Sequence, residues 1–322
     1  GISHQVLPER GMVLPGELIV GTDSHTTTYG AFGALGTGVG VTDMALVFAT
    51  GKLWFRVPES IKCFLEGETP SYIMGKDIIH HVLSLIGADG ANYKSIEFYG
   101  EPTKKLSIDA RMTLANMSIE AGAKFGIIPP DKKTIDYLAA RAPKSTSLRP
   151  VLSDSDATFE SHHSVDVTNL EPQVAKPPSP ANSVSVRDLE GVEIDEAFIG
   201  TCTNGRVEDL AIAARILKGR KVSSGTRLIV IPASVQVYRD AMAAGHIETI
   251  HQAGGIVEYP SCGPCIGGQL GVIGDNEVAI ATMNRNFTGR MGSNKALVYL
   301  ASPATVAASA LKGAIADPRQ YL

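Results

Sequence analysis

Short β-branched runs alternate with helix-forming stretches along most of the chain, and this alternation restricts the fold more than any other feature of the sequence. Residues 61–65 form such a run before the helical stretch 76–86, and residues 197–199 form another before 207–217. Further helices are expected over 42–55 and 108–121, and further strands over 256–259 and 278–281. Strands and helices that alternate in this way build parallel sheets, because each helix carries the chain back across the sheet to the next strand. The sequence therefore predicts an α/β fold.

The alternation lapses between residues 143 and 187, where Ser, Pro, Asp and Asn dominate. The Lys-Pro-Pro-Ser-Pro run at 176–180 is typical of a linker. A strand near 164–167 is the one regular element expected in this stretch. We therefore expect two α/β parts, a linker with irregular structure and a further α/β domain, which correspond to residues 1–58, 59–145, 146–187 and 188–322.

The net charge of the chain limits the kinds of molecule that we expect it to bind. The chain has 29 Lys and Arg against 33 Asp and Glu, a net charge of −4, whereas a general binder of nucleic acid or anionic membranes carries a basic excess. The longest apolar stretches, such as 44–49, fall far short of the roughly 20 residues that cross a bilayer. We expect neither a nucleic-acid nor a membrane partner.

The first residues contain no initiator Met, no basic region and no apolar region, so we do not expect a signal peptide there. Four cysteines in 322 residues are too few for a disulfide scaffold. We therefore expect a cytoplasmic location, and a chain that starts within a longer protein.

Reactive side chains follow the predicted strands of 188–322 at the points where those strands end. In open α/β sheets, ligands bind beyond the carboxyl ends of the strands. Because these ends meet at one edge, the sequence predicts a site there. Its candidate residues are Cys202, Asn204, Cys262, Cys265, Asn284, Arg285 and Arg290.

The three cysteines of this edge allow several interpretations. Three thiolates without an obvious fourth suit an iron–sulfur cluster with one open iron, since a cubane takes one thiolate per iron. A thioredoxin-like dithiol fits less well, because three glycines within 266–271 disfavour the helix that should follow Cys265. A structural zinc site usually takes ligands in close pairs, and Cys202 has no near neighbour. Buried, chemically silent cysteines are the remaining alternative, and Cys63 is expected to be one, packed in a strand.

Four motifs in order resemble those of the aconitase superfamily, and the chain is most similar to its large subunits of the 3-isopropylmalate dehydratase and homoaconitase group. The resemblance covers essentially the whole chain. The motifs are Gly-Thr-Asp-Ser-His-Thr at 21–26, Gly-Thr-Cys-Thr-Asn-Gly at 200–205, Cys-Gly-Pro-Cys at 262–265 and Asn-Arg-Asn-Phe-Thr-Gly-Arg at 284–290. The resemblance implies aconitase-like α/β/α domains with parallel or mixed sheets and a cluster between domains. Residues 1–58 would then be the remainder of the first domain, and 188–322 the cluster-binding domain.

The resemblance also implies an activity. The family's enzymes isomerise a hydroxy di- or tricarboxylate by removing water and adding it back, with a [4Fe–4S] cluster that oxygen degrades. The expected function is that of the 3-isopropylmalate dehydratase large subunit, in leucine biosynthesis. Homoaconitase, in lysine biosynthesis, is the alternative, and a cluster-free RNA-binding relative is the alternative from another class, which the acidic balance disfavours. The implied partner is a small subunit that carries the swivelling last domain.

Site residues follow from the matched motifs. The resemblance implies cluster ligands at Cys202, Cys262 and Cys265, and catalytic roles for His4, Asp23, His25 and Glu120, with Glu120 paired to His25. It further implies that Ser24, Arg285 and Arg290 bind substrate, and that Asn116, Asn204 and Asn284 lie around the cluster. The chemistry is consistent, because loss of hydroxide needs a Lewis acid and a proton donor, and carboxylates suit guanidinium forks.

Two parts of the family pattern have no match here. One is an N-terminal segment with an Asp-His pair, and the other is the last domain with a serine base and a further arginine. We therefore expect an incomplete active site without the small subunit and the N-terminal segment.

Overall fold

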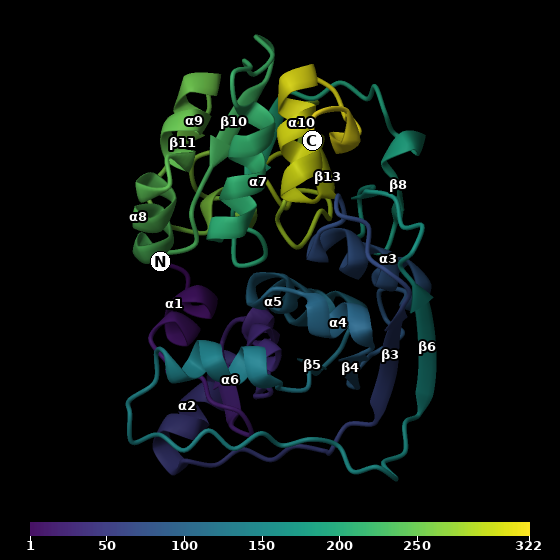
Figure 1. Ribbon diagram of the computed structural model, residues 1–322, viewed down its shortest axis with the longest axis vertical. Coiled ribbons are helices and arrows are strands. Elements are labelled where there is room, and N and C mark those ends of the chain that lie inside the picture. Colours follow the sequence, from purple (N-terminus) through teal and green to yellow (C-terminus); the bar gives the residue numbers. More distant parts are fainter. The chain divides into compact units, whose positions relative to one another are not determined.

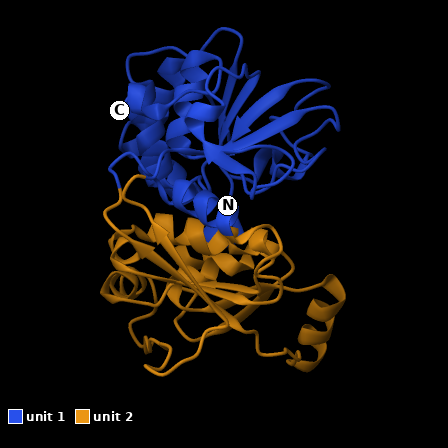
Figure 2. Ribbon diagram, turned by 90° about the vertical axis from the view of Figure 1, so that its right-hand side faces the viewer, with its two compact units in different colours: residues 1–5, 70–85, 170–322 blue, residues 6–69, 86–169 orange.

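The computed structural model describes residues 1–322 and divides them into two compact units. Each unit is assembled from segments that lie far apart in the sequence (Figure 2). The four-part division expected above stays a prediction. Unit 1 consists of residues 1–5, 70–85 and 170–322, and unit 2 consists of residues 6–69 and 86–169.

Unit 1 is built on a seven-stranded mixed sheet of order β11-β10-β9-β12-β13-β7-β8. Figure 1 labels β8, β10, β11 and β13 of this sheet. The first five strands in this order are parallel, whereas β7 and β8 continue the sheet antiparallel. The predicted α/β class with parallel or mixed sheets is thereby confirmed. The strands are β7 (Gln173–Ala175), β8 (Ser183–Ser185), β9 (Glu196–Ile199), β10 (Arg227–Val230), β11 (Ile256–Val257), β12 (Val278–Ala281) and β13 (Leu297–Ala301).

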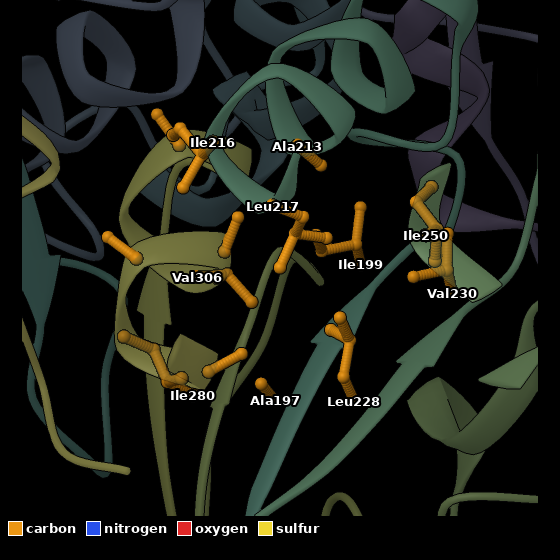
Figure 3. Close-up of a cluster of buried hydrophobic side chains, with 14 of the residues drawn as sticks. Ala197, Ile199, Ala213, Ile216, Leu217, Leu228, Val230, Ile250, Ile280 and Val306 are labelled. Atoms are coloured by element: carbon orange, nitrogen blue, oxygen red, sulfur yellow. The ribbon is translucent and has the colours of Figure 1, made fainter. Parts of the chain in front are cut away.

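Helices cover one face of this sheet, and the strand sequences alternate accordingly. Ala197 and Ile199 of β9 point into the core beneath the helices, while Phe198 between them belongs to the core on the opposite face (Figure 3). That opposite face is covered mainly by residues 263–296. The covering helices are α7 (Val207–Leu217), α8 (Val235–Ala243), α9 (His246–Ala253) and α10 (Pro303–Lys312), and the further α-helices α1 (Ser3–Glu9) and α3 (Gly75–Ile86) precede them in the chain.

Unit 2 contains a four-stranded parallel sheet of order β5-β4-β3-β6 and a two-stranded parallel sheet of β1 and β2. Cys63 lies in β3, fully buried, and burial raises the pKa of its thiol to about 12, as befits a packed residue. The strands are β1 (Leu18–Gly21), β2 (Leu35–Gly38), β3 (Ser60–Glu66), β4 (Ser95–Tyr99), β5 (Phe125–Ile127) and β6 (Ser161–Asp166), and the helices are α2 (Val41–Thr50), α4 (Glu101–Lys105), α5 (Ile108–Met117) and α6 (Lys132–Ala139).

Glycines let a 3₁₀ helix, η1 (Ser24–Phe32), pack directly on β2. A Cβ on Gly36 would lie 2.2 Å from the carbonyl oxygen of Thr26, and one on Gly38 would lie 2.8 Å from the Cα of Ser24. Any larger residue would push η1 away from the strand. The glycine-rich segment therefore serves close packing, which holds η1 in place.

The structure corrects several element boundaries. The helix expected over 42–55 ends at Thr50, because Gly51 adopts a left-handed conformation with φ of 68°. The helix expected over 108–121 changes at Met117 into a 3₁₀ turn, η2 (Ser118–Ala121). Nothing in the sequence predicted the helices α1, α4, α6 and α9 or the strands β2, β5, β7, β8 and β13.

Helix α2 is apolar yet has no buried residue. Phe48 on the helix and Trp54 just beyond it are 85% and 83% exposed. Among all helices of the chain, none is both long and apolar enough to cross a membrane.

Candidate active site

Loops that leave the carboxyl ends of β9, β11 and β12 bring the predicted cysteines of unit 1 to one asparagine. The side-chain amide of Asn284 donates to the Sγ of Cys202 at 3.4 Å, and the Sγ of Cys265 lies 3.5 Å from its Oδ1. The same amide donates to the Oγ1 of Thr203 at 2.6 Å. Cys202 and Cys265 are separated from Asn284 by 82 and 19 residues, so the convergence comes from the parallel sheet.

Cys262 joins the same group. It packs with Cys202 around Ile2 and Ala233, and its carbonyl accepts from the backbone N–H of Cys265 at 3.3 Å. Cys262 precedes a short 3₁₀ helix, η4 (Gly263–Ile266), which carries Cys265. All three are free thiols.

Two arginines lie in the segment after β12. The Nη2 of Arg290 is 3.6 Å from the Sγ of Cys265, and its guanidinium lies over the ring of Phe287 at 5.4 Å. A guanidinium only donates, so the sulfur is the acceptor in this contact. Arg285, half-buried, lies between Asn284 and Asn286 in the same segment.

The placement of the thiols distinguishes between the kinds of centre they could hold. No three His, Cys, Asp or Glu side chains lie close enough together to hold a single metal ion. A structural zinc requires its ligands around one ion, whereas each thiolate of a cubane binds a different iron. No α-helix follows Cys262, because η4 ends at Gly267 with φ of 73°. The three free thiols match three of the four thiolates that a cubane takes, one per iron.

Asn204 lies in the same loop as Cys202. Its amide donates to the Oδ1 of Asp209 at 3.0 Å, and Asp209 also accepts from the backbone N–H of Arg206 at 2.9 Å. These contacts tie the loop to the first turn of α7. His4, in α1, is buried within unit 1.

In unit 2, a carboxylate faces each nitrogen of the His25 ring. The Nε2 of His25 lies 2.7 Å from the Oε1 of Glu120, and the Nδ1 lies 3.4 Å from the Oδ1 of Asp23. The side chains of His25 and Glu120 are only 6% and 7% exposed, whereas that of Asp23 is 60% exposed. Because carboxylates only accept, a ring protonated on both nitrogens satisfies both contacts.

The backbone of unit 2 holds this histidine firmly. Asp23 caps η1 by accepting from the backbone N–H of His25 at 2.7 Å. Asn116 in α5 donates to the Oγ1 of Thr28 at 2.8 Å, and Thr28 donates to the carbonyl of His25 at 2.6 Å. Asn116 thus fastens α5 to η1.

Ser24 lines a cavity of about 540 Å³ in unit 2. Lys124 and the aromatic residues Phe55 and Tyr93 also line it. The Nζ of Lys124 lies 5.7 Å from the ring of Phe55 and 5.5 Å from that of Tyr93. Ser24 therefore shares the wall of this cavity with one cationic and two aromatic side chains.

The sequence prediction missed two polar residues beside the cysteines, Gln5 and Arg206. Both are buried, and the Nε of Arg206 donates to the Oε1 of Gln5 at 3.1 Å. Their positions in the sequence could have identified both residues, since Arg206 directly follows the 200–205 motif and Gln5 directly follows His4.

Comparison with known proteins adds independent information. The sequence model of the Aconitase family (aconitate hydratase) matches residues 1–191 and 186–313. The 3-isopropylmalate dehydratase large subunit 1 of Methanopyrus kandleri is 55% identical over all of this chain and 77% of its own length. The probable methanogen homoaconitase large subunit of Methanothermobacter thermautotrophicus is 52% identical over 99% of this chain and 74% of its own length. The crystal structure of Thermococcus kodakaraensis aconitase X covers 88% of this chain and 66% of its own, with 13% identity and a TM-score of 0.48.

Proposed function

This chain belongs to the aconitase family of hydro-lyases and is of the large-subunit type found in 3-isopropylmalate dehydratase and homoaconitase, and from that premise we propose that Cys202, Cys262 and Cys265 hold a [4Fe–4S] cluster. The contact of one amide, that of Asn284, with the thiols of Cys202 and Cys265 is the observation that carries this proposal. When bound, the cluster would supply a Lewis acid for the substrate hydroxyl.

The chain's own residues would bind the substrate and move protons. Arg285 and Arg290 would bind carboxylate groups, since a guanidinium presents a planar fork that matches a carboxylate. His25, held between Glu120 and Asp23, would act as a proton donor, because its contacts favour the doubly protonated ring. His4 would assist proton transfer, and Ser24 would bind the substrate. Asn116, Asn204 and Asn284 would support these groups.

We further propose 3-isopropylmalate as the substrate and a small subunit as the obligatory partner. Both relatives given above support the partner, since each is named a large subunit. The substrate is supported by the relative from Methanopyrus kandleri, which is named a 3-isopropylmalate dehydratase. Homocitrate is the second candidate substrate, because the homoaconitase relative is nearly as similar, at 52% against 55% identity.

The cluster is tested by anaerobic reconstitution of the chain with iron and sulfide. We expect about four irons per chain and a brown protein, because a cubane contains four irons. Cys202→Ser, Cys262→Ser and Cys265→Ser should each abolish uptake, and Cys63→Ser is the matched control that should not. Tight binding of one zinc with no uptake of iron would refute the proposal.

The substrate is tested with the reconstituted chain and its small subunit together. Absorbance of the unsaturated intermediate would be followed with 3-isopropylmalate, homocitrate and citrate. We expect the highest kcat/KM with 3-isopropylmalate. A preference for homocitrate would establish the second candidate instead.

A further inference from the structure

Arg206 is one of the largest fully buried side chains of the protein, with 1% of its surface exposed. Its Nη1 donates to the carbonyl of Thr203 at 2.6 Å, and its Nη2 donates to the carbonyl of Cys202 at 2.5 Å. Its Nε donates to Gln5 at 3.1 Å. The guanidinium thus spans two successive carbonyls of the Cys202 loop and a residue of α1.

The loop needs such a support because its backbone is strained. Thr201, immediately before Cys202, has φ of 73°, a left-handed conformation that costs a β-branched residue free energy. Residues in such conformations persist where neighbouring groups hold them. The Oγ1 of Thr201 contacts that of Thr203 at 3.0 Å, and Arg206 holds the two carbonyls that follow.

We propose that Arg206 is the positioning residue of Cys202. By holding the carbonyls of Cys202 and Thr203, it keeps the strained turn in the conformation that presents the thiol to Asn284. Through Gln5, it also joins the loop to α1, the helix that carries His4. Its importance for a cluster ligand rests on the proposed function, but its effect on the loop does not.

Arginine is suited to this task in a way that lysine is not. The rigid planar fork places donors in fixed directions toward two carbonyls and the amide, whereas a lysine ammonium is a single point on a flexible stem. Arg206→Lys should therefore keep the charge but hold the Cys202 loop less firmly. Arg206→Gln should lose most of the contacts that hold this loop.

The test measures how fast each cysteine of the metal-free full chain is alkylated by iodoacetamide, with the sites resolved by peptide mass spectrometry. We expect Cys202 to react about tenfold faster in Arg206→Gln than in the unmodified sequence, because the loop opens locally. The rate in Arg206→Lys should lie between these two rates. Cys265 should change less than Cys202. Cys63, buried in unit 2, reports general unfolding and should not change. Arg215→Gln, at an exposed position of α7, is the matched control.

A second variant keeps the test decisive if Arg206 variants do not fold. Gln5→Leu removes only the contact with Nε, and we expect it to raise the alkylation rate of Cys202 by a smaller factor. An unchanged Cys202 rate in folded Gln5→Leu and Arg206→Lys, or an equal rise at Cys63, would overturn the inference. Failure of the unmodified chain to take up iron would instead refute the proposed function. The alkylation rates would still test whether Arg206 positions Cys202.

Discussion

The imidazole of His25 lies between two carboxylates, of which one is nearly buried and the other is exposed. Glu120 is nearly buried and 2.7 Å from Nε2, whereas Asp23 is exposed and 3.4 Å from Nδ1. The closer, buried contact is the stronger one, because water screens it less. In the proposed reaction, we therefore expect Nδ1 rather than Nε2 to exchange a proton.

Glu120→Gln tests this arrangement. The amide preserves the shape of the carboxylate but cannot balance a positive ring, so we expect kcat with the small subunit to fall about tenfold or more. Glu59→Gln, at an exposed position, should leave kcat unchanged. The melting temperature should differ little among the three proteins, and an unchanged kcat in Glu120→Gln would exclude the proton-donor role of the pair.

Glu196 is a second buried carboxylate, in β9. Burial raises the pKa of Glu196 to about 7 from 4.5, although Arg227 lies 3.1 Å from its Oε2. In Glu277, by contrast, the hydrogen bond from the same arginine lowers the pKa. The guanidinium of Arg227 therefore contacts two carboxylates whose pKa values are shifted in opposite directions.

These shifts predict the pH dependence of stability. The folded chain binds the Glu196 proton more tightly than the unfolded chain, so the stability that this group contributes is present below pH 4.5 and is lost as pH rises to about 7. Asp77 acts in the same direction, since burial raises its pKa to about 6 from 3.8. In urea unfolding, we expect Glu196→Gln to lose less stability between pH 5 and pH 7 than the unmodified protein. Glu277→Gln is the control, because it removes a shift of opposite sign, and an equal slope in all three proteins would contradict the prediction.

At the scale of elements, α2 differs from every helix of the sheet in unit 1. Those helices bury alanine, leucine, isoleucine and valine against β9 and β10, whereas α2 buries none of its residues. Its stability must come from helix propensity and from its ends, where Gly40 and Gly51 flank it. Large apolar side chains that are exposed to water attract other apolar surfaces.

Phe48→Ser and Trp54→Ser test the exposure of these two side chains. Each should change the free energy of unfolding by about 0.5 kcal/mol or less, because no packing is lost. Each should also reduce the fluorescence of a bound hydrophobic dye. The comparison is Phe32→Ser in η1, whose fully buried ring should cost about 3 kcal/mol or more. A large loss of stability in Phe48→Ser would show that α2 is packed in solution.

At the scale of the whole molecule, the candidate residues are distributed over both units. Unit 1 contains the cysteines with Asn284 and Arg290, and unit 2 contains His25 with Asp23 and Glu120. The chain also spans about three quarters of the length of the relatives it matches, 77% and 74% for the two named above. Those relatives are large subunits, so catalysis by this type of chain involves a second protein.

We therefore expect the reconstituted chain alone to give no dehydration of 3-isopropylmalate, homocitrate or citrate, measured as absorbance of the unsaturated intermediate. A pocket open to water weakens the electrostatic contacts that such a reaction uses. Iron content measured on the same sample separates an inactive loaded chain from an unloaded one. Turnover comparable to that of the two-subunit enzyme would show that all catalytic groups lie within this sequence.

Local sequence was sufficient for the α/β class and for more than half of the helices and strands. Helix α7 and strand β12 have the predicted bounds, because their apolar periodicity is uninterrupted and polar or glycine residues flank them. Strand β11 was predicted to extend to residue 259 but ends at Val257. Helix α9, which begins directly after Gly245, was not predicted. Ends of this kind depend on hydrogen bonds with neighbouring elements, which local propensity does not describe.

The motifs alone predicted the candidate residues, since they place cysteine, asparagine and arginine after strands. The contacts of Asn284 with both Cys202 and Cys265, and the burial of Arg206 against the carbonyls of the Cys202 loop, follow from the assembled sheet and were not predictable from local sequence. The pairing of His25 with Glu120, 95 residues away, was implied by resemblance and is present in the structure. Periodicity and turn signals act over a few residues, whereas these contacts join segments that meet only when the sheets assemble and exclude water.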